Sequence, residues 1–343
     1  MLDVVVLLLG GNYASTAIGP VEVFHSAGSL WNVLIGGKAE PRFRVITASM
    51  DGGSVMSAYP VALSPQAAID DIERADVVIV PSSGLDFDKE LACHLRLMPW
   101  LRRMHQQGAY IAAVCTGVLF LAEAGLLDGR QATTHWAVGD ELAKRYPKVN
   151  WQTDMFVTED ERILCSGGVY AAIDLSLYMV EKLCGHEIAV DCAKSLVVGM
   201  PRSHQSGYAI LPLARPHADE RIRKAERYID QNYSQDLSIE TLAEQANMSP
   251  RNFLRRFKAA TGRLPGNYLQ TLRIAVAKRM LEEDKSSVQA ISLAVGYEDL
   301  AYFRTLFRRY TGMTPGDYRN QFGRTLQAAF TRSSGQLPRR GVA

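Results

Sequence analysis

The chain has 343 residues, of which 47% are hydrophobic and 22% are charged. These ordinary values exclude a wholly disordered or fibrous protein, and the length favours two domains or three small ones. The net charge of +2 hides an asymmetry, because residues 1–214 carry −7 and residues 215–343 carry +9. The basic part is therefore expected to meet a polyanion, either nucleic acid or an anionic membrane.

The five cysteines are an odd number and include no Cys-x-x-Cys pair. This pattern disfavours a zinc cluster or a secreted disulfide framework and favours a reducing compartment. The sequence starts MLDVVVLLLGG, which lacks a basic region and whose apolar run is too short for a signal peptide or a membrane span. We therefore expect a cytoplasmic protein with no membrane partner, and the sequence indicates neither a metal nor another cofactor.

Short apolar runs alternate with helical patterns through residues 1–199. The predicted strands are Val4–Leu9, Phe43–Ala48, Val77–Pro81, Tyr110–Val114 and Ile163–Ser166. The predicted helices are Val21–Leu30, Lys89–Gln107, Val118–Ala124, Ala137–Arg145, Tyr170–Leu183 and Ile188–Val198. Continuous apolar strands between helices predict a doubly wound, flavodoxin-like α/β domain, whose mostly parallel sheet is covered on both faces. Ligands on such sheets bind beyond the carboxyl ends of the strands.

One of these strand ends carries a candidate reactive group. In the stretch AYIAAVCTGVLFLAEAG a strand runs directly into Cys115, and Thr116 and Gly117 open a helix. This arrangement predicts a sharp turn that holds the sulfur over a helix N-terminus, where a thiolate is favoured. His135 follows twenty residues later in TTHW, and a base near a thiol is the minimum for nucleophilic catalysis. Because the chain has seven histidines, spacing alone also allows a coincidence.

Two segments with weak patterning bound the basic part. Residues 200–218 contain three prolines and little helical periodicity, so we interpret them as a linker. Residues 323–343 are predicted to be a flexible tail. An all-α domain is expected between them, over residues 219–322.

That domain contains one unit twice. Seven residues recur at an offset of 50, namely Phe253, Phe257, Thr261, Gly262, Pro265, Gly266 and Tyr268, matched by Phe303, Phe307, Thr311, Gly312, Pro315, Gly316 and Tyr318. Each copy predicts a helix, a tight turn and a second helix. In the first copy Ser238 and Ser249 are predicted N-caps and Gly262 ends the second helix. An amphipathic helix over residues 267–282 joins the copies.

The second helix of such a motif lies in the DNA major groove. Its outward side chains are therefore the candidates for DNA contact, namely Arg251, Leu254, Arg255, Arg256, Lys258, Leu300, Ala301, Arg304, Thr305, Arg308 and Arg309. Arginine can bond guanine O6 and N7 together, and leucine or alanine can contact a thymine methyl group. The alternative is that these cations form an ordinary solvated helix face.

Residues 219–322 closely resemble the DNA-binding domain of the AraC family of transcriptional regulators. The stretches that carry the likeness are LSIETLAEQANMSPRNFLRRFKAATGRLPGNYL and SVQAISLAVGYEDLAYFRTLFRRYTGMTPGDYR. The resemblance implies seven helices and two recognition helices that enter successive major grooves on one face of the DNA. Leu254 departs from the family, in which a polar reader often occupies that position.

Residues 1–199 resemble the class I glutamine amidotransferase-like superfamily, in its PfpI-like branch. Cys115, His135 and the loop Pro81–Gly84 correspond to the branch's nucleophile, histidine and post-strand loop. The phrase CTGVLFLAEAGLLDGRQATTHW is typical of the GlxA-like subgroup of AraC regulators. Enzymes of the branch place an acid in the loop after the first strand, where this sequence has Thr16. The departure disfavours turnover and favours a ligand pocket at Cys115, His135, Thr16 and Gly84.

The sequence thus favours a transcriptional regulator rather than an enzyme. We expect it to bind duplex promoter DNA at the nucleoid, to respond to a small-molecule effector, to form a homodimer and to meet RNA polymerase. Two alternatives stay open: a cysteine-dependent amidase or hydrolase with an accessory DNA-binding module, and a DNA-bridging protein with no effector.

Overall fold

The computed structural model describes residues 1–209, 217–283 and 285–323, so the predicted tail after Gly323 lies outside the described residues. The chain divides into two compact units, Met1–Ser206 (unit 1) and Gly207–Ala343 (unit 2). Their boundary falls inside the segment interpreted as a linker. Over the described ranges, no helix combines the length and the apolar character needed to cross a membrane.

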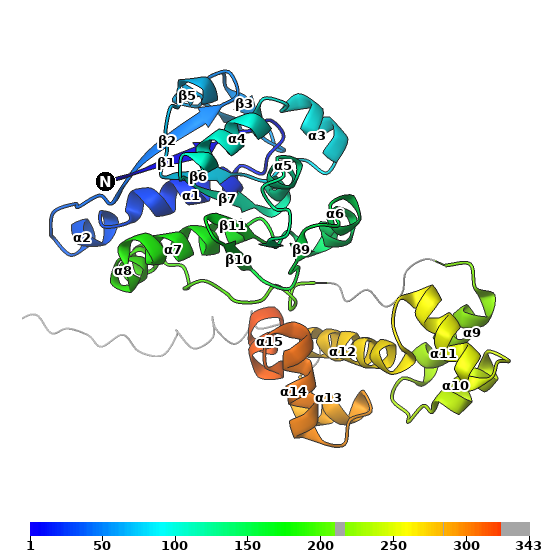
Figure 1. The fold of residues 1–343 in the computed structure, drawn as a ribbon. Coiled ribbons are helices and arrows are strands. Elements are labelled where there is room, and N and C mark those ends of the chain that lie inside the picture. Colours follow the sequence, from blue (N-terminus) through cyan, green and yellow to red (C-terminus); the bar gives the residue numbers. More distant parts are fainter. Residues whose placement is uncertain (210–216, 284, 324–343) are drawn as a thin grey trace, which may run out of the picture. The chain divides into compact units, whose positions relative to one another are not determined.

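Unit 1 is built on a seven-stranded sheet with the order β10-β11-β7-β6-β1-β2-β5 (Figure 1). The strands are β1 (Leu2–Leu7), β2 (Phe43–Ser49), β5 (Ala67–Ala68), β6 (Val77–Val80), β7 (Tyr110–Val114), β10 (Val157–Asp160) and β11 (Ile163–Ser166). Neighbouring strands are parallel except for β10, which runs antiparallel to β11. Two short ribbons pair β3 (Val55–Met56) with β4 (Ala62–Leu63) and β8 (Gln131–Ala132) with β9 (Asn150–Trp151). The predicted doubly wound, mostly parallel sheet is confirmed.

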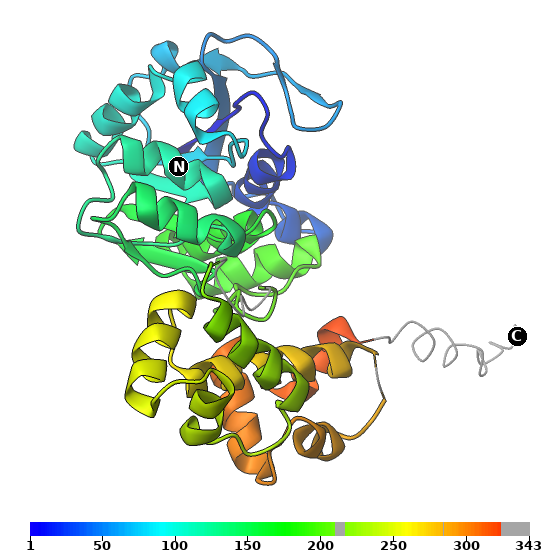
Figure 2. The ribbon, with the colours of Figure 1, turned by 90° about the vertical axis from the view of Figure 1, so that its right-hand side faces the viewer.

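Both faces of this sheet are buried, which explains its uninterrupted apolar strands. Alternate residues of β1 enter different cores: Val4 and Val6 pack on one face, and Val5 and Leu7 on the other. Helices cover both faces in Figures 1 and 2. One face meets α1 (Ser15–Ser26), α7 (Ala171–Cys184) and α8 (His186–Leu196), with α2 (Leu30–Leu34) beside α8. The other meets α3 (Phe87–Cys93), α4 (Leu97–Gln106), α5 (Val118–Glu123) and α6 (Gly139–Arg145).

Two helix predictions in unit 1 differ from the structure, and several short or polar elements were not predicted. The single helix predicted over Lys89–Gln107 is wrong, because α3 and α4 are separate. Pro99 lies in the first turn of α4, where its missing N–H is tolerated, so the helix has to begin just before it. Helix α1 begins at Ser15 rather than Val21 and contains Pro20. Strand β10, with the polar sequence VTED, carries no apolar run and was not predicted.

Unit 2 is all-α, as predicted, with seven helices among its described residues. They are α9 (Glu220–Asn232), α10 (Ile239–Gln245), α11 (Pro250–Thr261), α12 (Pro265–Glu283), α13 (Val288–Ala294), α14 (Leu300–Thr311) and α15 (Pro315–Phe322). Helix α12 contacts α11 of the first copy and α13, α14 and α15 of the second (Figure 1). The sequence repeat is therefore a repeat of structure joined by one long helix.

The repeated residues make repeated contacts. The ring of Phe257 lies edge-on to Tyr268 at 5.4 Å, and the ring of Phe307 lies edge-on to Tyr318 at 5.5 Å. The hydroxyl of Thr261 donates to a helix carbonyl at 2.8 Å, as does that of Thr311 in the second copy. Each bond joins the last residue of its helix to the carbonyl one turn earlier. The residues that recur at an offset of 50 thus form the same core contacts and the same helix ending in both copies.

Candidate nucleic-acid interface and ligand site

The first helix-turn-helix consists of α10 and α11. Ser238 caps α10, because its hydroxyl accepts from the backbone N–H of Thr241 at 3.1 Å. Asn247 forms the turn with φ of 51°, a left-handed conformation that asparagine tolerates well. Ser249 holds the N-cap position of α11, but the predicted side-chain cap bond is absent there. Pro250 begins the helix, since the first helical position needs no N–H donor.

The second helix-turn-helix consists of α13 and α14. Ser287 caps α13 by accepting from the N–H of Ala290 at 3.1 Å. Gly296 forms the turn with φ of 87°, and an added Cβ would lie 2.5 Å from the carbonyl oxygen of Ser234. Asp299 caps α14 and accepts from two backbone N–H groups. Asp299 was not predicted as a cap, although an aspartate just before a helix is a recognisable cap.

The recognition helices α11 and α14 bury their phenylalanines and present the predicted DNA-contacting residues outward. The exposed members are Arg251, Arg255, Lys258, Ala301, Arg304, Thr305, Arg308 and Arg309, and the partly exposed members are Leu254, Arg256 and Leu300. Where the structure describes the chain, none of the exposed cations of this set forms an ion pair with a carboxylate, whereas Arg256 does. Arg255 uses one donor within its own helix, since its Nη2 donates to the side-chain oxygen of Asn252 at 3.0 Å.

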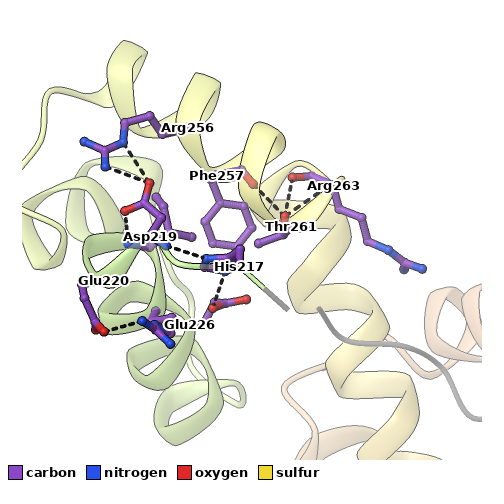
Figure 3. A network of polar contacts seen from close by, with 10 residues as sticks. His217, Asp219, Glu220, Glu226, Arg256, Phe257, Thr261 and Arg263 are labelled. Atoms are coloured by element: carbon purple, nitrogen blue, oxygen red, sulfur yellow. Dashed lines mark hydrogen bonds and ion pairs between the residues drawn. The ribbon is translucent and has the colours of Figure 1, made fainter. Parts of the chain in front are cut away.

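The partly exposed side chain of Arg256 is paired with Asp219. Its Nη2 lies 2.8 Å and its Nε 3.0 Å from Oδ2 of Asp219, which also caps α9 by accepting from the N–H of Ile222 (Figure 3). Burial would raise the pKa of Asp219, but the hydrogen bonds from Arg256 and from the backbone outweigh this effect and lower it. A phosphate contact by Arg256 therefore stays a prediction and has to compete with this ion pair.

Arg273 of α12 ties the two motifs together. Its guanidinium donates to the carbonyls of Tyr233 at 2.6 Å and Gln235 at 2.8 Å, which precede α10. It also donates to the carbonyl of Gly296 at 3.0 Å, in the turn of the second motif. Because charge-assisted hydrogen bonds are strong and directional, Arg273 fixes the separation of the two motifs. An arginine on a long helix gives no sequence signal for this role, and it was missed.

In unit 1 the predicted elbow at Cys115 is present. Strand β7 ends at Val114, and Cys115 has a left-handed φ of 57° before the chain turns into α5. Gly117 has to be glycine, because an added Cβ would lie 2.2 Å from the carbonyl oxygen of Pro81. The backbone of Ser83 braces the elbow, since its N–H donates to the hydroxyl of Thr116 at 2.8 Å and its carbonyl accepts from that hydroxyl at 2.7 Å. The loop after β6 thus supports the turn, as its predicted position requires.

The expected thiolate at Cys115 is wrong. The residue is only 4% exposed, and burial raises the pKa of its thiol to about 11, against smaller lowering effects from Thr116. The loss of hydration raises the pKa of the thiol more than the nearby helix start lowers it, because burial disfavours the charged form. The thiol stays protonated near neutral pH.

His135 is half-buried and lies one residue after Thr134, which bonds to the elbow. Its Nδ1 accepts from the N–H of Ala137 at 3.1 Å, and burial lowers its pKa, so the ring is neutral with the proton on Nε2. No described hydrogen bond joins it to the Cys115 thiol. Thr134 connects the two segments, because its hydroxyl donates to the carbonyl of Cys115 at 3.0 Å. With Nδ1 occupied by the backbone and the proton on Nε2, His135 has no free nitrogen to accept the proton of Cys115.

Thr16 and Gly84 have structural partners at the same edge of the sheet. The buried hydroxyl of Thr16, in the first turn of α1, donates to the carbonyl of Tyr13 at 2.6 Å and accepts from the N–H of Ser82 at 3.1 Å. An added Cβ at Gly84 would lie 2.6 Å from Oε1 of Glu90. Glu90, a buried acid with no hydrogen-bond partner at Oε2 among the described residues, was missed by the sequence analysis. Nothing in its sequence context separates it from a surface residue of an amphipathic helix.

The buried thiol leads to a prediction about labelling. At pH 7.5 iodoacetamide is expected to modify the exposed Cys93 well before Cys115, because Cys115 is buried and burial raises the pKa of its thiol to about 11. The rate at Cys115 should rise about tenfold per pH unit between pH 7 and pH 9, since its raised pKa of about 11 leaves little thiolate in that range. Mass spectrometry of the two cysteine-containing peptides measures both rates. A rate at Cys115 that is already constant across this range would contradict the prediction.

A cavity of about 230 Å³ lies elsewhere in unit 1. Its walls include Asp174 of α7, Met200 and Arg202. The carboxylate of Asp174 accepts from the backbone N–H of Arg202 at 2.7 Å and from Nη2 of the same residue at 2.6 Å. The cavity is thus bounded on one side by the segment that leaves unit 1, and its polar wall is an ion pair within the protein.

Comparison with known proteins assigns both units. Residues 3–182 match the DJ-1/PfpI family, and residues 242–321 match a helix-turn-helix domain. The chain is 28% identical over 312 residues to the HTH-type transcriptional regulator CdhR of Pseudomonas aeruginosa, which covers 89% of this chain and 86% of that protein. It is 30% identical over 235 residues to the regulator ArgR of the same species, covering 67% of this chain and 71% of that protein.

A third relative supports the same subgroup. The HTH-type transcriptional regulator GlxA of Rhizobium meliloti is 26% identical over 307 residues, covering 85% of this chain and 89% of that protein. In these comparisons the likeness extends over both units rather than over one alone. The chain therefore belongs to the GlxA-like group of AraC-type transcriptional regulators, in which a DJ-1/PfpI domain is followed by a helix-turn-helix DNA-binding domain.

Proposed function

We propose that the protein binds a specific duplex DNA sequence at promoters and changes transcription there in response to a small molecule bound beside Cys115 and His135. The observation that carries the DNA part is the pair of recognition helices, α11 and α14. Both have a buried phenylalanine face and an opposite face rich in exposed arginine. Two recognition helices on one scaffold are proposed to enter successive major grooves, as paired helix-turn-helix motifs do.

The outward residues divide by the contacts they are suited to make. Arg251 and Arg255 near the start of α11, and Arg304 in α14, are assigned to base edges together with Leu254, Leu300, Ala301 and Thr305. Lys258, Arg308 and Arg309 lie toward the C-terminal ends of their helices and are assigned to phosphates. Base contacts provide specificity, and phosphate contacts provide affinity and register.

The ligand part rests on the carboxyl edge of the sheet. The elbow at Cys115, the loop Pro81–Gly84 and the segment containing His135 converge there, as ligand sites in doubly wound sheets do. A neutral His135 with a proton on Nε2 and a protonated thiol at Cys115 are the hydrogen-bond donors proposed for the ligand. Thr16 and Gly84 are assigned to the walls of this site. Two chains, each with one ligand site, are proposed to act as a homodimer that contacts RNA polymerase.

The alternative of a cysteine-dependent amidase or hydrolase is disfavoured by the raised pKa of Cys115, because a nucleophile needs its thiolate near neutral pH. Assays on panels of small amides and esters test this alternative. Hydrolysis by the wild-type chain that disappears in Cys115→Ser would establish it.

Selection from a random pool of duplexes tests the DNA-binding function. The full chain should enrich a defined sequence and bind it about a thousandfold more tightly than an unrelated duplex, as specific DNA-binding proteins do. Equal affinity for the enriched and unrelated duplexes would favour the DNA-bridging alternative and contradict the proposal. Native mass spectrometry of the purified chain then searches for a bound small molecule to add to the same titration.

Lys258→Ala and Arg308→Ala are expected to weaken binding to all duplexes by a similar factor. Each substitution removes about one phosphate contact, so the slope of log affinity against log salt should become less steep by about one. Titrations of the enriched and an unrelated duplex at several salt concentrations measure this slope. Lys224→Ala, which changes an exposed lysine of α9, is the matched control and should leave the slope unchanged. A loss restricted to the enriched duplex would place Lys258 or Arg308 among the base readers instead.

A further inference from the structure

The side chain of Gln205 holds the last residues of unit 1 against the rest of that unit by hydrogen bonds. Gln205 is 2% exposed, and its side-chain Nε2 lies 2.7 Å from the carbonyl of Thr134, 2.9 Å from that of Thr153 and 3.2 Å from that of Met155. Its backbone N–H also donates to the carbonyl of Asp154 at 2.8 Å. Gln205 is almost fully buried and its amide lies among these carbonyls, so it is a fixed anchor, because releasing it would cost the hydrogen bonds of its two N–H donors.

Gln205 is bonded to the segment that carries His135 of the proposed ligand site. Thr134, which accepts from Gln205, precedes His135 and donates through its hydroxyl to the carbonyl of Cys115. On the other side an added Cβ at Gly167 would lie 2.5 Å from Oε1 of Gln205. A Cβ added at the next residue, Gly168, would lie 3.1 Å from the ring of His135. A movement of His135 is therefore transmitted to both neighbours of the Gln205 amide through direct contacts.

A second contact holds the segment that leads to this anchor. Arg202 is fixed to Asp174 through its backbone and its guanidinium, and that guanidinium lies over the ring of Phe156 at 4.2 Å. Phe156 in turn donates its backbone N–H to the carbonyl of Ser203 at 3.0 Å. The exit segment from Arg202 to Gln205 is thus bonded along its length to unit 1.

The chain enters unit 2 one residue after Ser206. Gly207 lies against Met313 and the carbonyl of Thr311, at the end of the second recognition helix. The ring of Tyr208 is edge-on to Phe322 at 5.1 Å. The ammonium group of Lys278, buried in α12, donates to the carbonyl of Ala209 at 2.7 Å. The segment is thus attached to unit 2 as Gln205 is attached to unit 1, and only Ser206 separates the two attachments.

We propose that Gln205 couples the ligand site to the DNA-binding unit, with residues 202–209 acting as a short strap fixed at both ends. The proposal rests on the proposed function and adds the route of its regulation. A ligand that displaces His135 shifts Thr134 and Gly168, changes the hydrogen bonds of Gln205, and alters how tightly the entry to unit 2 is held. By thermodynamic reciprocity, DNA bound to unit 2 has to alter the stability of the Gln205 anchor.

Reciprocity allows a test without knowing the ligand. The probe is the duplex enriched by the full-length wild-type chain, and the measurement is hydrogen exchange by mass spectrometry with and without it. In the wild type the duplex should change exchange in the peptides covering residues 153–156 and 203–205 by about fivefold, the lower end of typical allosteric coupling. Lys278→Met breaks the strap within unit 2, and Gln205→Met breaks it within unit 1 while keeping the side chain's length. Each should abolish this response in the 153–156 peptide.

Gln107→Met, which changes an exposed glutamine at the end of α4, is the matched control and should respond as the wild type does. Thermal unfolding of each variant identifies any that has lost its fold. The two strap variants change different units, so if one misfolds the other still tests the coupling. If the duplex protects α11 and α14 of the wild type but does not change exchange at residues 153–156, the coupling proposal is wrong and the DNA-binding proposal is unaffected. If no duplex is enriched, or the recognition helices are not protected, the proposed function itself fails and the coupling fails with it.

Discussion

Replacing Arg255 or Arg304 by alanine is expected to weaken binding to the enriched duplex by about 1–3 kcal/mol and to relax its sequence preference. Both side chains are exposed on the faces of α11 and α14 opposite the buried phenylalanines, where an arginine reaches a base edge. A bidentate contact with guanine O6 and N7 cannot be remade by alanine, so the discrimination at that base pair is lost. Affinity for an unrelated duplex should fall much less.

Fluorescence anisotropy with the enriched duplex and with each single-base variant measures this effect. Arg227→Ala, which changes an exposed arginine of α9, serves as the control and should retain the full preference. If Arg255→Ala and Arg304→Ala both bind the enriched duplex as tightly as the wild type, α11 and α14 have been wrongly assigned as the reading helices.

Phe307→Ala should destabilise unit 2 by about 3–5 kcal/mol, because it removes a large, fully buried ring and leaves a cavity. Phe257→Ala should have a similar effect, since the two residues occupy equivalent positions and make the same edge contact with a tyrosine. A loss of this size would unfold much of a marginally stable domain and remove DNA binding with it.

Native-state hydrogen exchange of the slowest amides in unit 2 measures this stability without assuming that both units unfold together. Tyr302→Ala is the matched control, because Tyr302 lies on the same helix but is 49% exposed. A change of less than about 1 kcal/mol for both phenylalanine variants would contradict the duplicated core, since large buried side chains cost more than that to truncate.

Unit 2 was predictable in detail because its signals are local and occur twice. The paired phenylalanines, the Gly262 and Gly312 helix ends and the prolines that begin α12 and α15 each encode a feature within a few residues. The parallel sheet of unit 1 was predictable for a related reason, since strands buried on both faces are continuously apolar. Strand β10 was not, because an edge strand with one partner needs no such pattern.

For the site at Cys115, only the course of the backbone could be predicted from the sequence. A strand that runs into Cys115 and then into a helix specifies the elbow, and the structure has it. The protonation state of the thiol depends on what covers it, and those residues come from distant parts of the chain. The same holds for Arg273, whose acceptors lie 23 to 40 residues away, and for Gln205, whose acceptors lie 50 to 71 residues away. Long-range partners of single polar side chains leave no periodicity to read.

Hydroxyl-radical footprinting of the full chain on its enriched duplex tests the central claim most directly, because that claim is about two recognition helices reading one DNA molecule. The account predicts two protected segments for each chain, on one face of the DNA and about 10–10.5 base pairs apart from centre to centre. Arg255→Ala should weaken protection at one segment and Arg304→Ala at the other. A single protected segment for each chain, or uniform protection with no boundaries, would contradict it.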